Sequence, residues 1–132
     1  MNTPNHLALL IAAPQPGETA MLADQAAMTA ALLGRGLPTA HILTLQGQLN
    51  RPRVTAFLQA ASRRVARWND GSIFVHVSGH GFFAGDTPAT ARPGLFFAET
   101  EDLTDDNHLF WDDFFASLAL PAGVGLTLLP DL

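Results

Sequence analysis

The chain has 132 residues, of which 48% are hydrophobic and 14% are charged, and its formal net charge is −5. These values predict one folded globular domain over residues 1–132 rather than a disordered chain. Its seven basic residues are all arginines, and a mildly acidic chain is a poor candidate for nucleic-acid binding, which needs clustered cations. The absence of cysteine excludes disulfides, thiolate-bound zinc and a thiol nucleophile within these residues, and it fits a cytoplasmic protein.

The first apolar run, Leu7–Ala13, favours a buried strand over a membrane segment. It is too short to cross a bilayer, it lacks a preceding basic region, and Pro14 and Pro16 come directly after it. Its hydrophobicity is uniform rather than alternating, which is typical of a strand in a parallel sheet with both faces covered. We therefore expect neither a membrane nor a nucleic acid among the partners of this chain.

Helices and strands are predicted to alternate along the rest of the chain. In order, we expect a helix over 18–33, a strand over 41–45, a helix over 52–68, a strand over 72–81, a loop over 82–94, a short strand over 95–98, an acidic polar stretch over 99–107, a helix over 110–118 and a buried strand over 124–129. This alternation predicts an α/β fold, with a mostly parallel sheet between helices on both faces.

One strand runs directly into Ser78-Gly79-His80-Gly81. A histidine at the end of a buried strand, between two glycines, can act as a general base or acid near neutral pH. Gly81 has no side chain to block its own N–H, which could therefore face an oxyanion. The alternative interpretation is an ordinary loop histidine in a glycine-rich turn.

A second strand ends at Asp131-Leu132. Sites in open parallel sheets gather at the carboxyl ends of the strands, so neighbouring strands would bring His80 and Asp131 to one crevice. We interpret His76, inside the earlier strand, as a hydrogen-bonded core residue. The other histidines have no spaced partner and the acidic residues do not match an EF-hand loop, so no metal site is predicted.

The stretch Phe74-Val75-His76-Val77-Ser78-Gly79-His80-Gly81 resembles the strand and Ser-Gly-His-Gly motif of caspase-like cysteine peptidases, most closely metacaspases and their bacterial relatives. In that family a later strand ends in Asp-x-Cys-His-Ser-Gly, and residues 126–132 resemble that strand up to Asp-x. The resemblance implies a caspase-like three-layer α/β/α sandwich. It also implies that His80 is the catalytic base, that Gly81 offers an oxyanion N–H, and that Asp131 selects Arg or Lys at the cleavage site of a protein or peptide substrate.

The sequence departs from the family at the nucleophile, because these residues hold no cysteine. Three explanations remain open: a peptidase fragment whose cysteine lies on a following portion, an artificially shortened chain, or a degenerate homologue. An apolar last strand would otherwise be an exposed sheet edge, so we expect a C-terminal peptidase portion to pack there. The chemistry needs no cofactor; some relatives use calcium for activation.

Two other functions compete with that of a cysteine endopeptidase. A pseudo-peptidase would keep the fold without the nucleophile and act as a binding or scaffolding module. A small-ligand-binding domain of flavodoxin-like type would share only the general α/β architecture.

Overall fold

The computed structural model describes residues 5–98 and 102–132; part of the predicted acidic stretch, residues 99–101, lies outside them. The elements are the strands β1 (His6–Ala12), β2 (Ile42–Gln46), β3 (Gly71–Ser78), β4 (His80–Ala84), β5 (Arg92–Phe96), β6 (His108–Phe110) and β7 (Val124–Asp131), the helices α1 (Ala20–Gly34), α2 (Arg51–Val65) and α3 (Trp111–Ser117), and the short 3-10 helix η1 (Thr39–His41).

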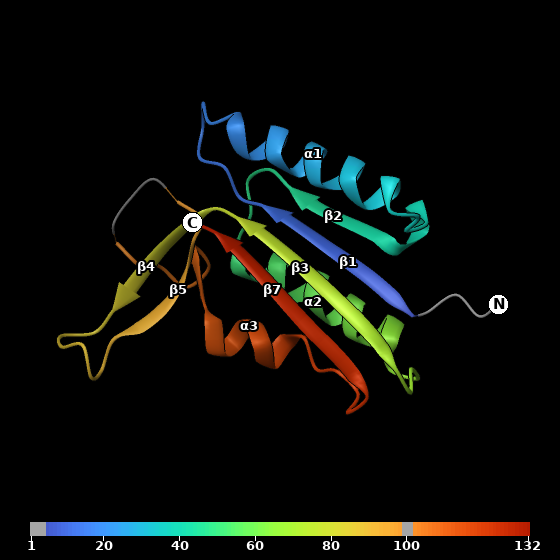
Figure 1. The fold of residues 1–132 in the computed structure, drawn as a ribbon. Coiled ribbons are helices and arrows are strands. Elements are labelled where there is room, and N and C mark those ends of the chain that lie inside the picture. The colour runs from blue at the N-terminus through green and yellow to red at the C-terminus, as the bar shows by residue number, and fades with distance from the viewer. Residues whose placement is uncertain (1–4, 99–101) are drawn as a thin grey trace.

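A four-stranded sheet with the order β2-β1-β3-β7 forms the centre of the molecule, and every pair in it is parallel (Figure 1). Its two middle strands are the most buried strands of this sheet, and residues Leu7 to Ala12 of β1 are all buried. The predicted uniform, two-sided burial of this first strand is therefore confirmed, as is the predicted α/β class with a parallel sheet.

Helices cover both faces of this sheet. The side chains of Leu9, Val75 and their alternate neighbours pack with Val54 and Leu58 of α2 in the main hydrophobic core. The opposite face carries α1, whose Gln25 donates a hydrogen bond to the carbonyl of Leu10 in β1 (3.0 Å). Figure 1 shows α1 on one side of the sheet and α2 and α3 on the other, which gives the three-layer α/β/α arrangement.

Residues 82–94 were predicted as a loop, and this prediction is wrong at the two ends of the segment, which belong to β4 and β5, and right for residues 85–91 between them. β4 and β5 form an antiparallel hairpin, and β6 adds a third strand. The exposed fraction alternates along β4, as expected for a strand with one covered face. Gly94 lets β5 lie close to its neighbours, because a Cβ there would be only 2.7 Å from the ring of Phe82. Pro93 is tolerated because β6 reaches only as far as Gly94.

The strand predicted over 72–81 ends earlier than expected. β3 stops at Ser78, and His80 and Gly81 begin β4 in the second sheet. The chain therefore changes sheets at Gly79, and His80 lies just beyond the parallel sheet rather than within it.

β7 was predicted as a buried strand, but only Val124 is buried in it. The strand is the sheet's edge within the described part of the chain, because β3 lies on one side and no strand on the other. Its leucines are consequently open to solvent, with Leu126 and Leu129 exposed by 38% and 47%.

Candidate active site

The ends of β3 and β7 meet at one edge of the sheet, as the sequence predicted for neighbouring strands. Ser78 of β3 lies opposite Asp131 of β7, and the N–H of Gly79 donates to the carbonyl oxygen of Asp131 (3.2 Å). His80 comes immediately after Gly79. Figure 1 shows the C-terminus next to the start of β4. The predicted base and the predicted pocket acid thus lie on neighbouring backbone segments.

A third residue, Glu18, joins this edge from the turn after β1. Its Oε1 lies 2.8 Å from Nε2 of His80, and both side chains are about one-third exposed (35% and 37%). Oε1 also accepts a hydrogen bond from the backbone N–H of Gln15 (2.7 Å). The hydrogen bond from His80, followed by the one from Gln15, lowers the pKa of the Glu18 carboxyl below its usual value.

Sequence reasoning missed Glu18 because it treated the residue as the start of a helix. α1 begins only at Ala20, so Glu18 lies in the preceding turn. One signal could have found it: Glu18 is the first acid after the carboxyl end of β1, and β1 is the parallel neighbour of β3. In such a sheet, side chains that come after neighbouring strands share one edge.

The backbone N–H of Gly81 points away from β5. Phe97 follows β5 and lies opposite Asn107, which precedes β6. The N–H of Phe97 donates to the carbonyl of Asn107 (2.8 Å), so these two facing residues form a hydrogen-bonded pair. Because such pairs alternate along an antiparallel ladder, Leu95 also directs its backbone groups toward β6. Gly81, which faces Leu95, therefore belongs to a pair without hydrogen bonds, and its N–H is directed to the open side of β4.

Leu132 closely approaches Gly81. A Cβ placed on Gly81 would lie 3.2 Å from Cδ1 of Leu132, within tight van der Waals contact. The backbone that leaves β7 thus passes directly beside the first residues of β4. Gly81 itself is exposed.

Two buried polar side chains lie on the α1-facing side of β3. Ser78 is 1% exposed and His76 is 5% exposed, and neither Ser78 Oγ nor His76 Nδ1 has a hydrogen-bond partner among the described residues. His76 was predicted to be a core residue, which its burial confirms. The predicted hydrogen bond is absent at Nδ1.

His76 and Asp131 line an open cavity of about 370 Å³ between α1 and the sheet. Asp24 of α1 completes the polar part of its wall, and the rest is alanine and methionine. Asp131 itself is exposed. A cavity with two carboxylates suits a cationic, hydrogen-bonding group better than an apolar one.

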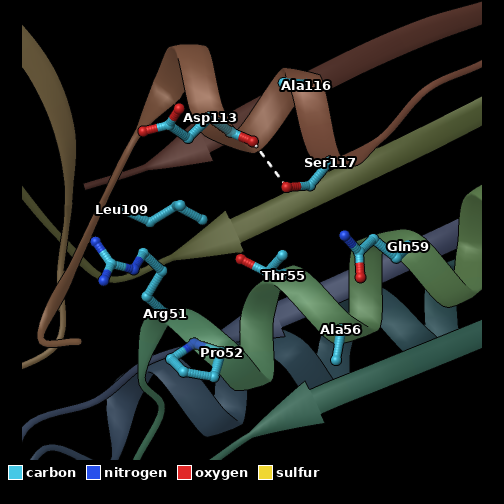
Figure 2. A pocket seen from close by; sticks show the side chains of 9 residues that line it. All are labelled: Arg51, Pro52, Thr55, Ala56, Gln59, Leu109, Asp113, Ala116 and Ser117. Carbon is cyan, nitrogen blue, oxygen red and sulfur yellow. Dashed lines mark hydrogen bonds between the residues drawn. The ribbon is translucent and has the colours of Figure 1, made fainter. Parts of the chain in front are cut away.

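A separate groove of about 460 Å³ runs between α2 and α3 (Figure 2). It is lined by Arg51, Pro52, Thr55, Ala56, Gln59, Leu109, Asp113, Ala116 and Ser117. The Ser117 hydroxyl donates to the carbonyl oxygen of Asp113 within α3 (2.8 Å), so it is already occupied. None of the residues His80, Gly81 and Asp131 lines this groove, and it adds nothing to the site at the strand ends.

No protein-family model and no curated protein matches this chain. Within residues 5–98 and 102–132, no group of three or more His, Asp or Glu side chains is arranged to hold a metal ion. None of the helices that the structure describes has the length and hydrophobicity needed to cross a membrane.

Proposed function

We propose that this chain is the larger part of a caspase-like cysteine endopeptidase that cleaves after Arg or Lys. One observation carries the proposal: Ser78 and Asp131 lie opposite each other, so the residue that resembles the catalytic histidine and the residue that resembles the pocket acid share one sheet edge. The resemblance itself rests on two short segments that are far apart in the sequence. Their pairing in space is what a common active site requires.

The nucleophile would come from a cysteine outside these 132 residues. In the first step, His80 takes the proton of the thiol, and the thiolate attacks the carbonyl carbon of the scissile bond. The N–H of Gly81, which points to the open side of β4, would help to hold the oxyanion. His80 then gives its proton to the leaving amine, and water later hydrolyses the thioester with His80 again as the base.

Two observations support the assigned position of the cysteine. The backbone leaving β7 passes beside Gly81, and Gly79 is hydrogen-bonded to Asp131. A residue after Leu132 would therefore start beside Gly81, the residue that follows His80 in the chain. The exposed leucines of β7 offer the surface on which a C-terminal peptidase portion would pack.

The preference for Arg or Lys would come from the cavity beside α1. Asp131 supplies a carboxylate there, and a guanidinium can bind a carboxylate through two parallel hydrogen bonds. Asp24 of α1 lines the same cavity and supplies a second carboxylate for such a group.

The test begins with the coding sequence beyond Leu132 and with the protein that it encodes. If a cysteine is encoded there, this protein should cleave fluorogenic peptides that end in Arg or Lys. His80→Ala should abolish the cleavage, whereas His41→Ala, which removes a histidine at the opposite end of the sheet, should leave it unchanged. Cleavage that survives in the His80 variant refutes the assigned base.

The role of Asp131 needs its own comparison. Asp131→Asn should reduce cleavage after Arg far more than cleavage after an uncharged residue of similar length, because only the charged side chain loses its partner. Asp70→Asn, which removes a distant carboxylate, is the matched control. An unchanged ratio of the two cleavage rates would remove Asp131 from the specificity pocket.

The second candidate is a catalytically inactive pseudo-peptidase that binds or scaffolds a partner. It is favoured by the composition of the chain, which contains no cysteine at all. If no cysteine is encoded after Leu132, the prediction becomes binding without hydrolysis. Peptides ending in Arg should then bind at Asp131 in a calorimetric titration and be recovered intact.

A further inference from the structure

The contact between Glu18 and His80 has a consequence for the chemistry of the histidine. We infer that Glu18 is a positioning residue whose carboxylate holds the Nε2–H of His80 and thereby reserves Nδ1 for the reacting groups. The inference rests on the proposed function for its role in peptide hydrolysis. Its structural part, the fixed tautomer of His80, can be tested without any catalytic activity.

The turn that presents Glu18 is preorganised. Residues Gln15-Pro16-Gly17-Glu18 form a tight turn in which Gly17 has φ of 88° and the N–H of Glu18 donates to the carbonyl of Gln15 (3.0 Å). Proline at the second position and glycine with positive φ at the third are the residues that a type II turn requires.

Two further hydrogen bonds hold this turn in place. The Gln15 N–H binds the Glu18 carboxylate (2.7 Å), and the Gln15 side chain donates to the carbonyl of Ala98 (2.8 Å). Ala98 lies just after β5, the strand that pairs with the start of β4. The turn is therefore tied both to the carboxylate that it presents and to the sheet that carries His80.

The protonation of the two partners determines which nitrogen of His80 is free. An ionised carboxylate only accepts hydrogen bonds, so the 2.8 Å contact requires a proton on Nε2. The lowered pKa of Glu18 keeps that carboxylate ionised at neutral pH. A neutral imidazole carries one N–H, so Nδ1 is then the acceptor. Within the described residues, Nδ1 of His80 has no hydrogen-bond partner of its own.

The proton path is set by this arrangement. Nδ1 takes the proton from the thiol while Nε2–H stays on Glu18, and the ring becomes an imidazolium beside a carboxylate. The same proton then leaves Nδ1 for the nitrogen of the departing amine, as the C–N bond breaks and the thioester remains. Glu18 stabilises the charged intermediate form of His80 and never receives the proton.

The first experiment measures the tautomer directly in the 132-residue chain. In a ¹⁵N-labelled sample at alkaline pH, Nε2 of His80 should show a pyrrole-like shift and Nδ1 a pyridine-like shift. In Glu18→Ala the two shifts should move toward each other, and in the control Asp86→Ala they should not. An Nδ1–H tautomer in the parent chain, or shifts that Glu18→Ala leaves unchanged, would overturn the inference.

The second experiment uses the encoded protein with its cysteine and the variant Glu18→Gln. Glutamine keeps an oxygen for the Gln15 N–H, so the turn is retained while the negative charge is lost. We expect kcat to fall roughly tenfold to a hundredfold with KM nearly unchanged, since orientation and charge stabilisation of the base are lost but substrate contacts are not. A kcat equal to that of Asp86→Asn would refute the positioning role.

The two experiments separate this inference from the proposed function. If no form of the encoded protein cleaves peptides, the peptidase assignment fails and the tautomer measurement still decides the role of Glu18. If the protein cleaves peptides and Glu18→Gln is fully active, the peptidase assignment stands and the positioning role is wrong.

Discussion

Removing the hydroxyl of Ser78 should stabilise the free protein, although most substitutions of buried residues destabilise. Ser78 is 1% exposed and its Oγ has no hydrogen-bond partner among the described residues. A buried hydroxyl without a partner costs about 1–3 kcal/mol relative to one in water. Ser78→Ala removes this cost and leaves only the small void of one oxygen atom. We therefore expect a net gain of about 1 kcal/mol, which corresponds to roughly 3–6 °C in Tm at this chain length.

Ser72→Ala is the matched control, because it makes the same chemical change near the start of the same strand. The Ser72 hydroxyl has a partner, Nδ1 of His6, at 2.6 Å. Its loss should cost about 0.5–1.5 kcal/mol. Urea denaturation at neutral pH, with thermal melts as a second probe, measures both variants against the parent chain. The two substitutions should shift the midpoint in opposite directions.

A loss of more than about 1 kcal/mol in Ser78→Ala would refute this reasoning, since it would mean that the hydroxyl has a partner in solution. The encoded protein carrying Ser78→Ala should bind Arg-ended peptides as the parent protein does, because Ser78 Oγ is closed off from solvent and Ser78 does not line the cavity beside α1.

Three further outcomes are expected from the fold. Gly94→Ala should lower the free energy of unfolding, measured by urea denaturation, by about 1–3 kcal/mol, because a Cβ there would lie 2.7 Å from a backbone oxygen of β6. The control is Gly34→Ala, whose Cβ would meet nothing within 4 Å and which should be neutral or stabilising. The hydrogen bond from His80 lowers the pKa of Glu18 in the folded protein. The ionised carboxylate therefore stabilises the fold above about pH 4.5, and this stabilisation is lost as the pH falls through the lowered pKa. In a series of thermal melts at decreasing pH, Glu18→Gln should lose less stability over this acidic range than the parent chain. The 132-residue chain should self-associate through β7 in light scattering, and Leu129→Lys should reduce this, while a monomer at high concentration would contradict the exposed-edge argument.

The parallel core was predictable because its signal is local and strong. β1 is a nearly continuous apolar run and β3 has an apolar centre, and a sheet covered on both faces buries strands of this kind. The sequence also predicted that His80 and Asp131 would lie at the same sheet edge if their two strands were neighbours, because neighbouring parallel strands end at the same edge. The structure meets this condition, since β3 and β7 are paired.

The hairpin of β4 and β5 was not predictable by the same signals. Its strands contain Gly81, Pro93 and Gly94, residue types that normally indicate loops. They are tolerated here for reasons that lie elsewhere in the chain: Gly94 fits under Phe82, and Pro93 lies beyond the reach of β6. Tertiary contacts thus override the local preference, and the period-2 burial of β4 was too short to reveal the strand.

The charge partner of His80 was missed for a different reason. Glu18 lies 62 residues earlier in the sequence, and its own neighbourhood resembles the first turn of a helix. Glu18 is positioned by the type II turn before α1. Pro16 and Gly17 indicate the turn in the sequence, but they do not indicate which residue Glu18 will contact. That contact depends on the strand order, which places β1 beside β3 and so brings Glu18 next to His80.

The order β1-β3-β7 explains why three distant residues can act together. Neighbouring strands lie about 4.8 Å apart, so groups at the ends of three consecutive strands fall within about 10 Å of one another. The group after β1 holds the histidine after β3, and β7 delivers the acid on its other side. Each residue is held by a different segment, Glu18 by the turn after β1, His80 by the start of β4 and Asp131 by the end of β7, so the turn after β1 can be altered without moving β7. Substitutions in residues 15–18 should therefore change how His80 works, while changes at Asp131 should alter which side chain is accepted.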